Sequence, residues 1–375
     1  MRVLVVNSGS SSLKLRVLGT DDTVLWSRDA APPSELSDDE LAALLAEAPG
    51  AGGVGHRVVH GGADLTEPVL LDDAMVDRLD ALTALAPLHQ PPAVRLIRLA
   101  RAARPGVPHV ACFDTSFHRT LPPAAETYPV PAAWREAYPI RRYGFHGLSH
   151  AWATHRVAEL TGAPPRRLVV CHLGAGASLS AVLAGRCVDT TMGFTPLEGL
   201  MMATRSGSVD PGLVLWLIRH AGLSPDDVEH QLVYESGLLG MAGDRDMRTV
   251  LERAGAGEPA AALAVEVYLH RLRAGIAAMC ASLDGLDTLV FTGGVGEHAW
   301  QLRARAADGL GFLGVRLDEP ANTDATGDTE LTGTGATVRS FLIEAREDVE
   351  ITRAVRVLLT TDPGYGGRAE HPPTA

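Results

Sequence analysis

The feature that most constrains the fold is an internal repeat of a strand, a turn of small residues and a second strand. The segment VVNSGSSSLKLRVL near the N-terminus is matched by VCHLGAGASLSAVL in the middle of the chain. Aligned at a separation of 165 residues, the two segments pair Asn7 with His172, Gly9 with Gly174, Val17 with Val182 and Leu18 with Leu183. Because this separation is nearly half of the 375 residues, the repeat predicts two similar domains, each opening with a β-hairpin.

Elsewhere the sequence alternates buried strand patterns with amphipathic helix patterns, which predicts an α/β fold. Strands are expected at the start of Val54–Gly62, in Pro108–His118 up to Asp114, and at the start of Asp287–His298. Helices are expected from the Ser37–Glu40 capping box to Ala48, over Asp73–Leu85 and over Pro259–Leu283. The Gly- and Pro-rich end, 364–375, is expected to fray.

Length and composition are those of a globular protein of two or three domains, with 46% hydrophobic and 21% charged residues. The net charge of −12 argues against a nucleic-acid partner, because phosphate neutralisation needs a basic surface. No apolar run approaches the ~20 residues of a membrane span, and Met1 leads directly into a strand pattern, so neither a membrane segment nor a signal peptide is expected. The four scattered cysteines are interpreted as free buried thiols, which favours the cytoplasm.

Three turns rich in glycine, serine or alanine follow predicted strands, at 9–12, 174–176 and 293–296. Such turns expose successive backbone N–H groups without side-chain crowding, which is how a loop holds phosphate. Two of them, facing each other across a cleft, would hold a polyphosphate from both sides, and the third would let the backbone approach a nucleoside. Tight turns without a ligand are the alternative, because glycine is the default turn residue.

Ser10, Ser12 and Lys14 form the first group of candidate phosphate ligands. Lys14 is the only lysine among the 33 basic residues. A strand places Ser12 and Lys14 on one face, where a hydroxyl and a compact ammonium suit Mg²⁺-bound phosphate oxygens better than a broad guanidinium does. The alternative is a solvated strand lysine.

Arg57 and Arg205 each lie beside glycine and away from the arginine-rich helices. Two such arginines would offset the charge of a transferring phosphoryl group, and surface salt bridges are the alternative. Asp114 ends an apolar strand, where a carboxylate of an α/β sheet faces the ligand crevice and is placed to hold Mg²⁺. Its alternative role is the N-cap of a following helix.

Six histidines are interpreted as lying in loop-like motifs without convincing metal-ligand spacing, namely His56, His60, His89, His146, His150 and His172. We expect them to be hydrogen-bond donors, with one or two of them catalytic. A Ser–His–Asp hydrolase is not expected, because no serine occupies a nucleophile elbow.

Taken together, the motifs resemble those of a known family. VLVVNSGSSSLKL and MGFTPLEGLMMATRSGSVDPG resemble the two signatures of the acetate kinase family, and GHRVVHGG, FDTSFH, YGFHGLSH, CHLGAGAS, SGLLG and FTGGVGEH follow the family's order and spacing. The resemblance runs from about Val3 to about Arg353. It implies two duplicated actin-like (ribonuclease H-like) domains with a central cleft, one formed by 1–115 with 349–375 and the other by 116–348.

The resemblance also implies a reaction, in which acetate takes the γ-phosphate of ATP to give acetyl phosphate and ADP, reversibly and with Mg²⁺ or Mn²⁺. A carboxylate is already a nucleophile, so catalysis reduces to positioning and charge neutralisation. The resemblance further implies a homodimer formed through the second domain.

By the same resemblance, roles fall on individual residues. The catalytic residues would be Asp114, Arg57, Arg205 and His146. Phosphate and nucleotide would be bound by Asn7, Ser10, Ser12, Lys14, His172, Gly174, Gly176, Asp246, Met247, Arg248, Gly294 and Gly296. Acetate would lie against Arg57, Val59, Leu88, His89, Phe145 and Pro196. The metal ligands would be Asn7 and Glu347.

Three loop positions depart from the family pattern, since Ala175 and His298 stand where the family has Asn, and Ser208 where it has Asp. These three positions leave open which phosphoryl donor is used and how fast phosphoryl transfer is. A pyrophosphate-using enzyme and a non-catalytic nucleotide-binding protein are therefore alternatives. Propionate or another short-chain carboxylate is the alternative acceptor, because one methylene changes affinity by only ~1–3 kcal/mol. An actin- or chaperone-like ATPase would share the fold and would hydrolyse ATP without acetate.

Overall fold

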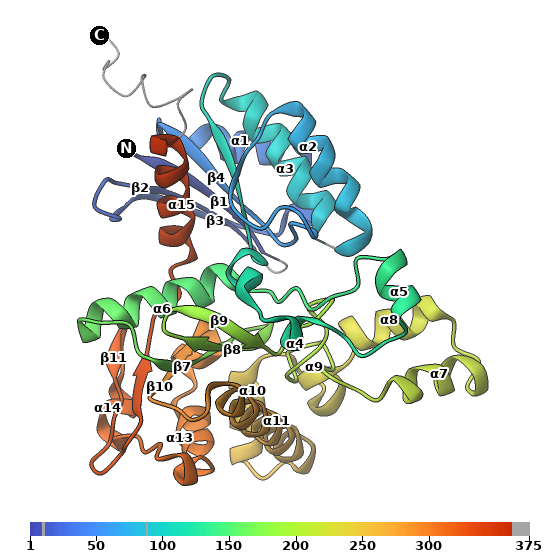
Figure 1. The fold of residues 1–375 in the computed structure, drawn as a ribbon, viewed down its shortest axis with the longest axis vertical. Helices are drawn as coiled ribbons and strands as arrows, with labels where there is room; N and C mark the ends of the chain where they lie inside the picture. The colour runs from blue at the N-terminus through green and yellow to red at the C-terminus, as the bar shows by residue number, and fades with distance from the viewer. Residues whose placement is uncertain (10–11, 88, 362–375) are drawn as a thin grey trace. The chain divides into compact units, whose positions relative to one another are not determined.

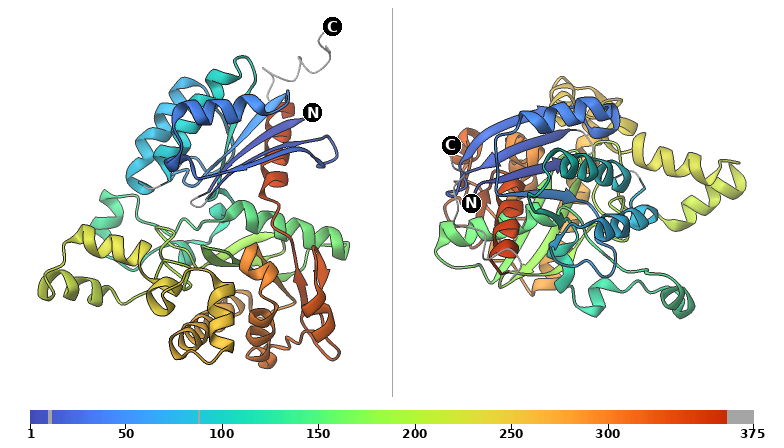
Figure 2. Two further views of the ribbon diagram at one scale, coloured as in Figure 1. Left: turned by 180° about the vertical axis from the view of Figure 1, so that it is seen from behind. Right: turned by 90° about the horizontal axis from the view of Figure 1, so that it is seen from above.

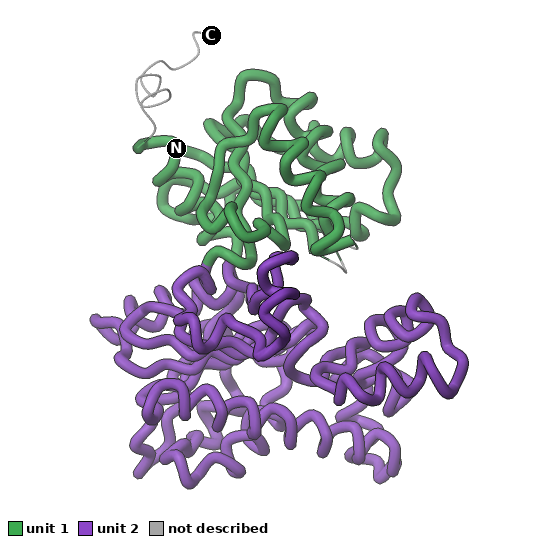
Figure 3. The backbone as a smooth tube through the Cα atoms, turned by 45° about the vertical axis from the view of Figure 1, so that its right-hand side comes forward, with its two compact units in different colours: residues 1–116, 346–375 green, residues 117–345 purple. Residues whose placement is uncertain are grey.

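The computed structural model describes residues 1–9, 12–87 and 89–361. Unit 1 comprises Met1–Ser116 and Arg346–Ala375, and unit 2 comprises Phe117–Ala345 (Figure 3). Of the predicted features, Ser10, Leu88 and the C-terminal stretch 364–375 lie outside the described residues.

Within its described residues, unit 1 is built on a six-stranded mixed sheet with the order β3-β2-β1-β4-β6-β5 (Figure 1). The strands are β1 (Val3–Ser8), β2 (Leu13–Leu18), β3 (Val24–Ala30), β4 (Gly53–Val58), β5 (Val69–Leu70) and β6 (His109–Phe113). The first three form an antiparallel meander, whereas β1, β4 and β6 run parallel and β5 is antiparallel to β6.

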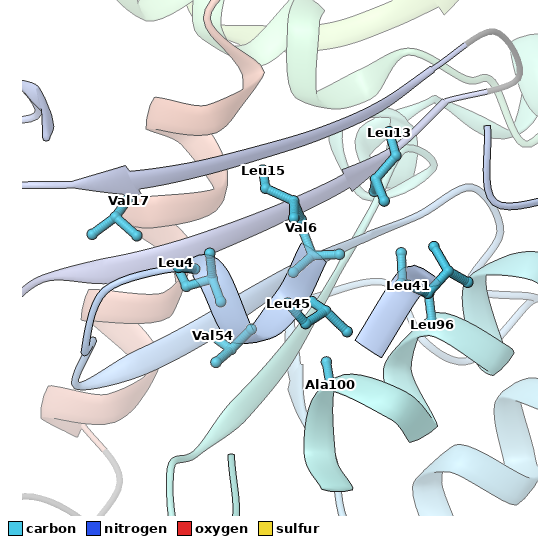
Figure 4. Close-up of a cluster of buried hydrophobic side chains, with 11 residues drawn as sticks. Leu4, Val6, Leu13, Leu15, Val17, Leu41, Leu45, Val54, Leu96 and Ala100 are labelled. Atoms are coloured by element: carbon cyan, nitrogen blue, oxygen red, sulfur yellow. The ribbon is translucent and has the colours of Figure 1, made fainter. Parts of the chain in front are cut away.

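Helices cover both faces of this sheet. They are α1 (Asp38–Glu47), α2 (Asp73–Asp80), α3 (Gln90–Ala103) and α15 (Glu347–Thr361), with 3₁₀ turns at Pro33–Glu35 and Ala81–Leu85. Leu4 and Val6 of β1 pack with Leu45 of α1 and Leu96 of α3 on one face (Figure 4). On the other face α15 packs against β1 and β4. A Cβ on Gly55 would lie 2.4 Å from the Ile351 side chain, so only glycine permits this approach.

Unit 2, which is described throughout, repeats the sheet of unit 1. Its strands are β7 (Arg167–Leu173), β8 (Ala177–Leu183), β9 (Arg186–Thr190), β10 (Thr288–Thr292), β11 (Thr329–Glu330) and β12 (Arg339–Leu342). Read from β9, their order is β9-β8-β7-β10-β12-β11, and each neighbouring pair has the same parallel or antiparallel sense as its counterpart in unit 1. The duplicated α/β fold predicted from the repeat is confirmed.

The helices of unit 2 are more numerous than those of unit 1. They are α4 (Pro123–Glu126), α5 (Ala132–Ala137), α6 (Gly147–Thr161), α7 (Pro211–His220), α8 (Pro225–Tyr234), α9 (Gly237–Ala242), α10 (Met247–Gly255), α11 (Pro259–Leu283), α12 (Gly293–His298), α13 (Trp300–Asp308) and α14 (Glu319–Asp324), with 3₁₀ turns at Ser116–Thr120 and Gly311–Leu313. In Figure 2, α7 and α8 project as a protrusion of this unit. None of the helices in the described residues is long and apolar enough to cross a bilayer.

The two hairpins of the repeat differ in the length of their turns. In the first, the Gly9 N–H donates to the Ser12 carbonyl at 2.9 Å, and in the second the Gly174 N–H donates to the Gly176 carbonyl at 2.9 Å. The second turn is therefore one residue shorter, because it closes on the residue two positions on rather than three.

As a consequence, the ungapped alignment of the second strands is wrong by one position. Lys14 lies opposite Asn7 in unit 1, whereas Ser178 lies opposite His172 in unit 2. Lys14 thus corresponds to Ser178. Leu183, which the alignment matched to a buried leucine, is exposed because it lies one position beyond the equivalent site.

Several local predictions are confirmed and two need correction. The Ser37 capping box and the helix at Pro259–Leu283 are present, and all four cysteines are free and buried. The helix expected over Asp73–Leu85 changes to 3₁₀ geometry after Asp80. The interpretation of all six histidines as loop residues is wrong for three of them, because His56 lies on β4, His150 within α6 and His172 on β7.

Candidate active site

The candidate side chains of unit 1 lie where three parallel strands end. Asn7 lies near the end of β1, Arg57 near the end of β4, and Asp114 directly after β6. Because the carboxyl ends of parallel neighbours meet at one edge of a sheet, these side chains gather there. The matching edge of unit 2 carries His172 on β7 and the glycine turn 293–296, which forms the first residues of α12 after β10.

Asn7, Arg57, Asp114 and Glu347, which we name the Arg57 cluster, are joined by direct contacts. Arg57 donates from Nε to Asp114 Oδ1 at 3.0 Å and from Nη2 to Asp114 Oδ2 at 2.7 Å. The Asp114 residue is only 1% exposed. This bidentate pair fixes the plane of the guanidinium.

Glu347 enters the Arg57 cluster from the far end of the chain, as the first residue of α15. Its Oε2 accepts a hydrogen bond from Asn7 Nδ2 at 2.7 Å and lies 3.7 Å from Arg57 Nη1. Burial acts to lower the pKa of Arg57, but the carboxylates of Asp114 and Glu347 outweigh it and hold that pKa above its ordinary value. The guanidinium therefore stays charged.

The donor chemistry of the Arg57 cluster fits a magnesium ion that takes most of its ligands from elsewhere. Asn7 and Glu347 offer amide and carboxylate oxygens, which are the hard donors that Mg²⁺ prefers, and Mg²⁺ usually keeps waters and substrate phosphates as its other ligands. Across the described part of the chain, no three His, Cys, Asp or Glu side chains gather as a metal site. The protein thus offers only part of a coordination shell.

Lys14 lies beside the Arg57 cluster. It is exposed and pairs directly with Asn7 across the hairpin, and directly opposite residues of antiparallel strands point to the same face. Ser12 closes the turn through its carbonyl. Val59 is buried directly after β4, and His89 directly precedes α3.

In unit 2, three histidines and two serines gather around the start of α6, and we name His146, Ser149, His150, His172 and Ser178 the His146 cluster. The rings of His146 and His172 lie 4.4 Å apart between centroids. Ser178 Oγ lies 3.0 Å from His146 Nδ1 and 2.7 Å from His150 Nε2, and Ser149 Oγ lies 2.8 Å from His172 Nδ1. His146 is the N-cap of α6 and has a φ of +57°, in the left-handed region that non-glycine residues rarely adopt.

Gly176 lets the short hairpin turn lie against two predicted catalytic side chains. A Cβ on Gly176 would lie 3.0 Å from His146 Cε1 and Nε2, and 3.6 Å from Arg205 Nη1. Arg205 also donates from Nη1 to the Pro196 carbonyl at 3.3 Å. The structure therefore brings an imidazole, a guanidinium and the turn containing Gly176 together within unit 2.

Two buried histidines are neutral, namely His150 within the His146 cluster and His118, whose ring lies 5.7 Å from that of His150 between centroids. Burial first, and then His118 and His172, hold the pKa of His150 well below its usual range. Burial also lowers the pKa of His118 to about 4. His118 contacts the Phe145 carbonyl through Nε2 at 3.0 Å and Cys187 Sγ through Nδ1 at 3.2 Å, so it supports the buried Phe145 that precedes His146.

The predicted nucleotide segments lie on separate elements. Asp246 caps α10 by accepting from the Arg248 N–H at 2.9 Å, and Met247 is buried. This helix packs on α11 and α9, whereas α12, with Gly294 and Gly296, packs on β7 and β10. The predicted nucleotide site thus draws on at least two separate helix starts.

Arg303 is a residue that the sequence analysis missed. It is 1% exposed and donates to the Gly296 carbonyl at 2.8 Å, the Glu297 carbonyl at 2.7 Å and Asn322 Oδ1 at 2.7 Å. Burial lowers its pKa to about 10. Its hydrogen bonds tie the end of the glycine turn to α13 and α14. In the sequence it is one arginine of a helical pattern, which gives no signal of burial.

The three departures from the family pattern have different structural settings. Ser208 forms two hydrogen bonds with Gly199. Ser208 Oγ accepts from the Gly199 N–H at 3.0 Å, and the Ser208 N–H donates to the Gly199 carbonyl at 2.9 Å. Ala175 is exposed and accepts at its carbonyl from the Ala203 N–H at 3.1 Å. His298 is exposed at the end of α12.

Comparison with known proteins gives a consistent result. The sequence model described as the Acetokinase family matches residues 34–353. The acetate kinase of a Synechococcus species is 43% identical over 404 aligned residues, covering 96% of this chain and 99% of the relative, and that of Streptomyces avermitilis is 40% identical, covering 96% and 98%.

Solved structures agree with the sequence relatives. The acetate kinase of Porphyromonas gingivalis superposes with a TM-score of 0.86 at 29% identity, covering 96% of this chain and 99% of its own. The propionate kinase of Francisella tularensis superposes with a TM-score of 0.86 at 32% identity, covering 95% of this chain and 99% of its own.

Proposed function

This chain belongs to the acetokinase family and phosphorylates acetate with ATP, and we propose how its residues divide that work. The observation that carries the proposal is the buried bidentate pair of Arg57 and Asp114 at the carboxyl edge of the sheet. Asp114 fixes the plane of a guanidinium that stays charged, and Arg57 then binds the acetate carboxylate and the equatorial oxygens of the transferring phosphoryl group.

The groups of unit 2 act on the phosphoryl group itself. Arg205 and His146 donate hydrogen bonds to its oxygens, and the turn containing Gly174 and Gly176 binds the phosphates of ATP through backbone N–H groups. The closeness of Gly176 to both side chains supports this division. No general base is required, because the attacking acetate oxygen already carries the negative charge.

A magnesium ion completes the charge balance in this proposal. Glu347 and Asn7 would hold it through a carboxylate and an amide oxygen, and Lys14 would approach the phosphates from the same face as Asn7. A magnesium ion held there would supply positive charge to offset that of the phosphate oxygens. Activity should vanish with excess EDTA and return with Mg²⁺ or Mn²⁺, and Glu347→Gln should raise the Mg²⁺ concentration needed for half activity.

Propionate is the second candidate acceptor beside acetate. Curated acetate kinases at 40–43% identity favour acetate, whereas a propionate kinase is among the matching structures. Val59, His89, Phe145 and Pro196 are the proposed surroundings of the acyl chain. Because one methylene contributes only ~1–3 kcal/mol, use of both acids is expected.

Acyl-hydroxamate formation tests the proposal directly. The purified chain is incubated with Mg²⁺, hydroxylamine and either acetate, propionate or butyrate, using ATP or pyrophosphate as donor. Signal with ATP and acetate supports the proposal. Signal only with another acid or with pyrophosphate would mean that the chain uses a different acceptor or phosphoryl donor. Arg205→Ala should lower kcat by about 10²–10³, whereas Arg339→Ala, which removes a half-exposed surface ion pair with Glu330, should not.

The homodimer implied by the family is proposed to form through the α7 protrusion. Leu213, Leu215 and Trp216 of α7 are 45–55% exposed, which suits a second copy of this chain. Trp216→Glu should shift the mass measured by light scattering from dimer to monomer. Trp134→Glu, which alters an equally exposed tryptophan on α5, should leave the mass unchanged.

The proposed compartment is the cytoplasm. All four thiols are free and buried, and burial raises the pKa of Cys112 to about 12 and that of Cys280 to about 11. Thiols that are kept reduced fit a reducing compartment. Fractionation of the producing cells tests this placement.

A further inference from the structure

Ser178 joins two histidines of the His146 cluster through a single hydroxyl. It is fully buried on β8, with His146 Nδ1 at 3.0 Å and His150 Nε2 at 2.7 Å from its Oγ. A serine hydroxyl has one proton to donate and two lone pairs to accept with. Only one of the two rings can therefore receive the serine proton, and the question is which.

The surroundings of His150 decide the direction. Its Nδ1 has no hydrogen-bond partner among the residues that the structure describes. Its ring packs within centroid distances of 6.3, 5.7 and 6.3 Å of the rings of Phe117, His118 and His172. If the serine donated to His150 Nε2, a neutral His150 would carry its proton on Nδ1, as a buried N–H without an acceptor. Such orphaned N–H groups are rare in native proteins.

His150 is neutral, because burial and its histidine neighbours hold its pKa well below the usual range. Its single proton therefore lies on Nε2 and is donated to Ser178 Oγ. Ser178 Oγ has no partner other than these two rings among the described residues, so its own proton has an acceptor only if it is donated to His146 Nδ1. The remaining proton of a neutral His146 must lie on Nε2.

We propose that His150 and Ser178 are positioning residues that fix His146 as the tautomer with its proton on Nε2. The Cε1–Nε2 edge of the His146 ring is the edge that faces Gly176. A Cβ on Gly176 would lie 3.0 Å from both of these ring atoms and 3.6 Å from Arg205 Nη1. The chain of hydrogen bonds thus presents an N–H donor to the phosphate-binding turn. The opposite tautomer would present a lone pair there and repel phosphoryl oxygens.

The use of this donor rests on the proposed function, but the tautomer itself does not. Long-range ¹H–¹⁵N NMR of the full chain labelled with ¹⁵N-histidine separates the two tautomers, with His146→Gln identifying the signals. The wild type should show His146 protonated on Nε2 alone. A proton on Nδ1 in the wild type overturns the proposal without any variant.

Ser178→Ala should replace the single tautomer by a mixture and lower kcat about 10- to 100-fold, with KM for acetate and ATP changed little. Ser180→Ala is the matched control, because Ser180 lies on the same strand and face as Ser178 and is equally buried. His150→Gln, which keeps a side-chain N–H, should restore more activity than His150→Leu.

An unchanged tautomer in Ser178→Ala, with kcat equal to that of Ser180→Ala, overturns the proposal. An inactive wild type with the Nε2 tautomer intact would instead contradict the proposed function and leave the hydrogen-bond chain standing. If Ser178→Ala does not fold, the wild-type spectrum and the pair of His150 variants decide the outcome.

Discussion

Replacing Asp114 by Asn should destabilise unit 1 far more than an ordinary surface substitution. Three hydrogen bonds, at 3.0, 3.2 and 2.7 Å, connect the Arg57 guanidinium to a carboxylate that is 1% exposed. Removing one partner of a buried ion pair costs about 3–5 kcal/mol, because the other charge is left uncompensated. Glu347, 3.7 Å from Arg57 Nη1, supplies part of the lost compensation, so we expect about 3 kcal/mol.

Hydrogen exchange measured by mass spectrometry reports this loss locally, on peptides covering β4 and β6. A cost of about 3 kcal/mol corresponds to a roughly 150-fold rise in the opening equilibrium of these strands. The same change in Asp73→Asn removes a pair with Arg101 in which the carboxylate is 95% exposed, and it should cost less than about 1 kcal/mol. Equal protection of β4 in the two variants would refute the reasoning. The kcat of Asp114→Asn should also fall, because the Arg57 guanidinium is no longer held in one orientation by a bidentate carboxylate.

Three further predictions follow from burial and close approach. Gly176→Ala should lower kcat about 10-fold or more in the hydroxamate assay without unfolding the chain, because the new Cβ would lie only 3.0 Å from the neighbouring imidazole. His60, His109 and His118 have folded pKa values of about 4, lowered by burial from 6.5. These three histidines are neutral in the folded state, so the free energy of unfolding is highest above pH 6.5 and falls as the pH drops toward 4. Each histidine lowers it by up to about 1.4 kcal/mol per pH unit in this range. Urea unfolding at pH 7, 6 and 5 measures the decrease. Arg303→Leu should raise KM for ATP at least several-fold and leave KM for acetate unchanged in steady-state assays, because its carbonyl contacts hold the end of the glycine turn.

The helices, strands and turns of each unit could be predicted from the sequence because their signals are local, and the duplication followed from comparing two such local patterns 165 residues apart. Strand periodicity, the capping box at Ser37 and turns of small residues each act within about ten residues. The register of the repeat could not be predicted in the same way. Whether a turn closes at Ser12 or at Gly176 depends on which N–H meets which carbonyl, and one residue of difference moves every later side chain to the other face.

The candidate residues of the site could be chosen from the sequence, but the contacts between them could not be predicted. Glycine neighbours drew attention to Arg57 and Arg205, and the end of an apolar strand to Asp114. The bond between Asn7 and Glu347 joins residues 340 positions apart, and nothing local in the sequence indicates it. Ser178 was missed because a serine inside an apolar strand looks like part of the core, although its partners are two histidines.

The divergence of the two hairpins follows from what covers each of them. Lys14 and Ser178 occupy the same position, opposite Asn7 and His172. The first is exposed, whereas the second is covered by His150 of α6. An ammonium buried against a neutral imidazole would have to lose its charge or remain unpaired, and both are costly. A hydroxyl has neither of these costs, and it can accept a hydrogen bond from one histidine while it donates one to another. The duplicated fold therefore keeps a cation on the open hairpin, and the covered hairpin holds a group that orients its neighbour instead.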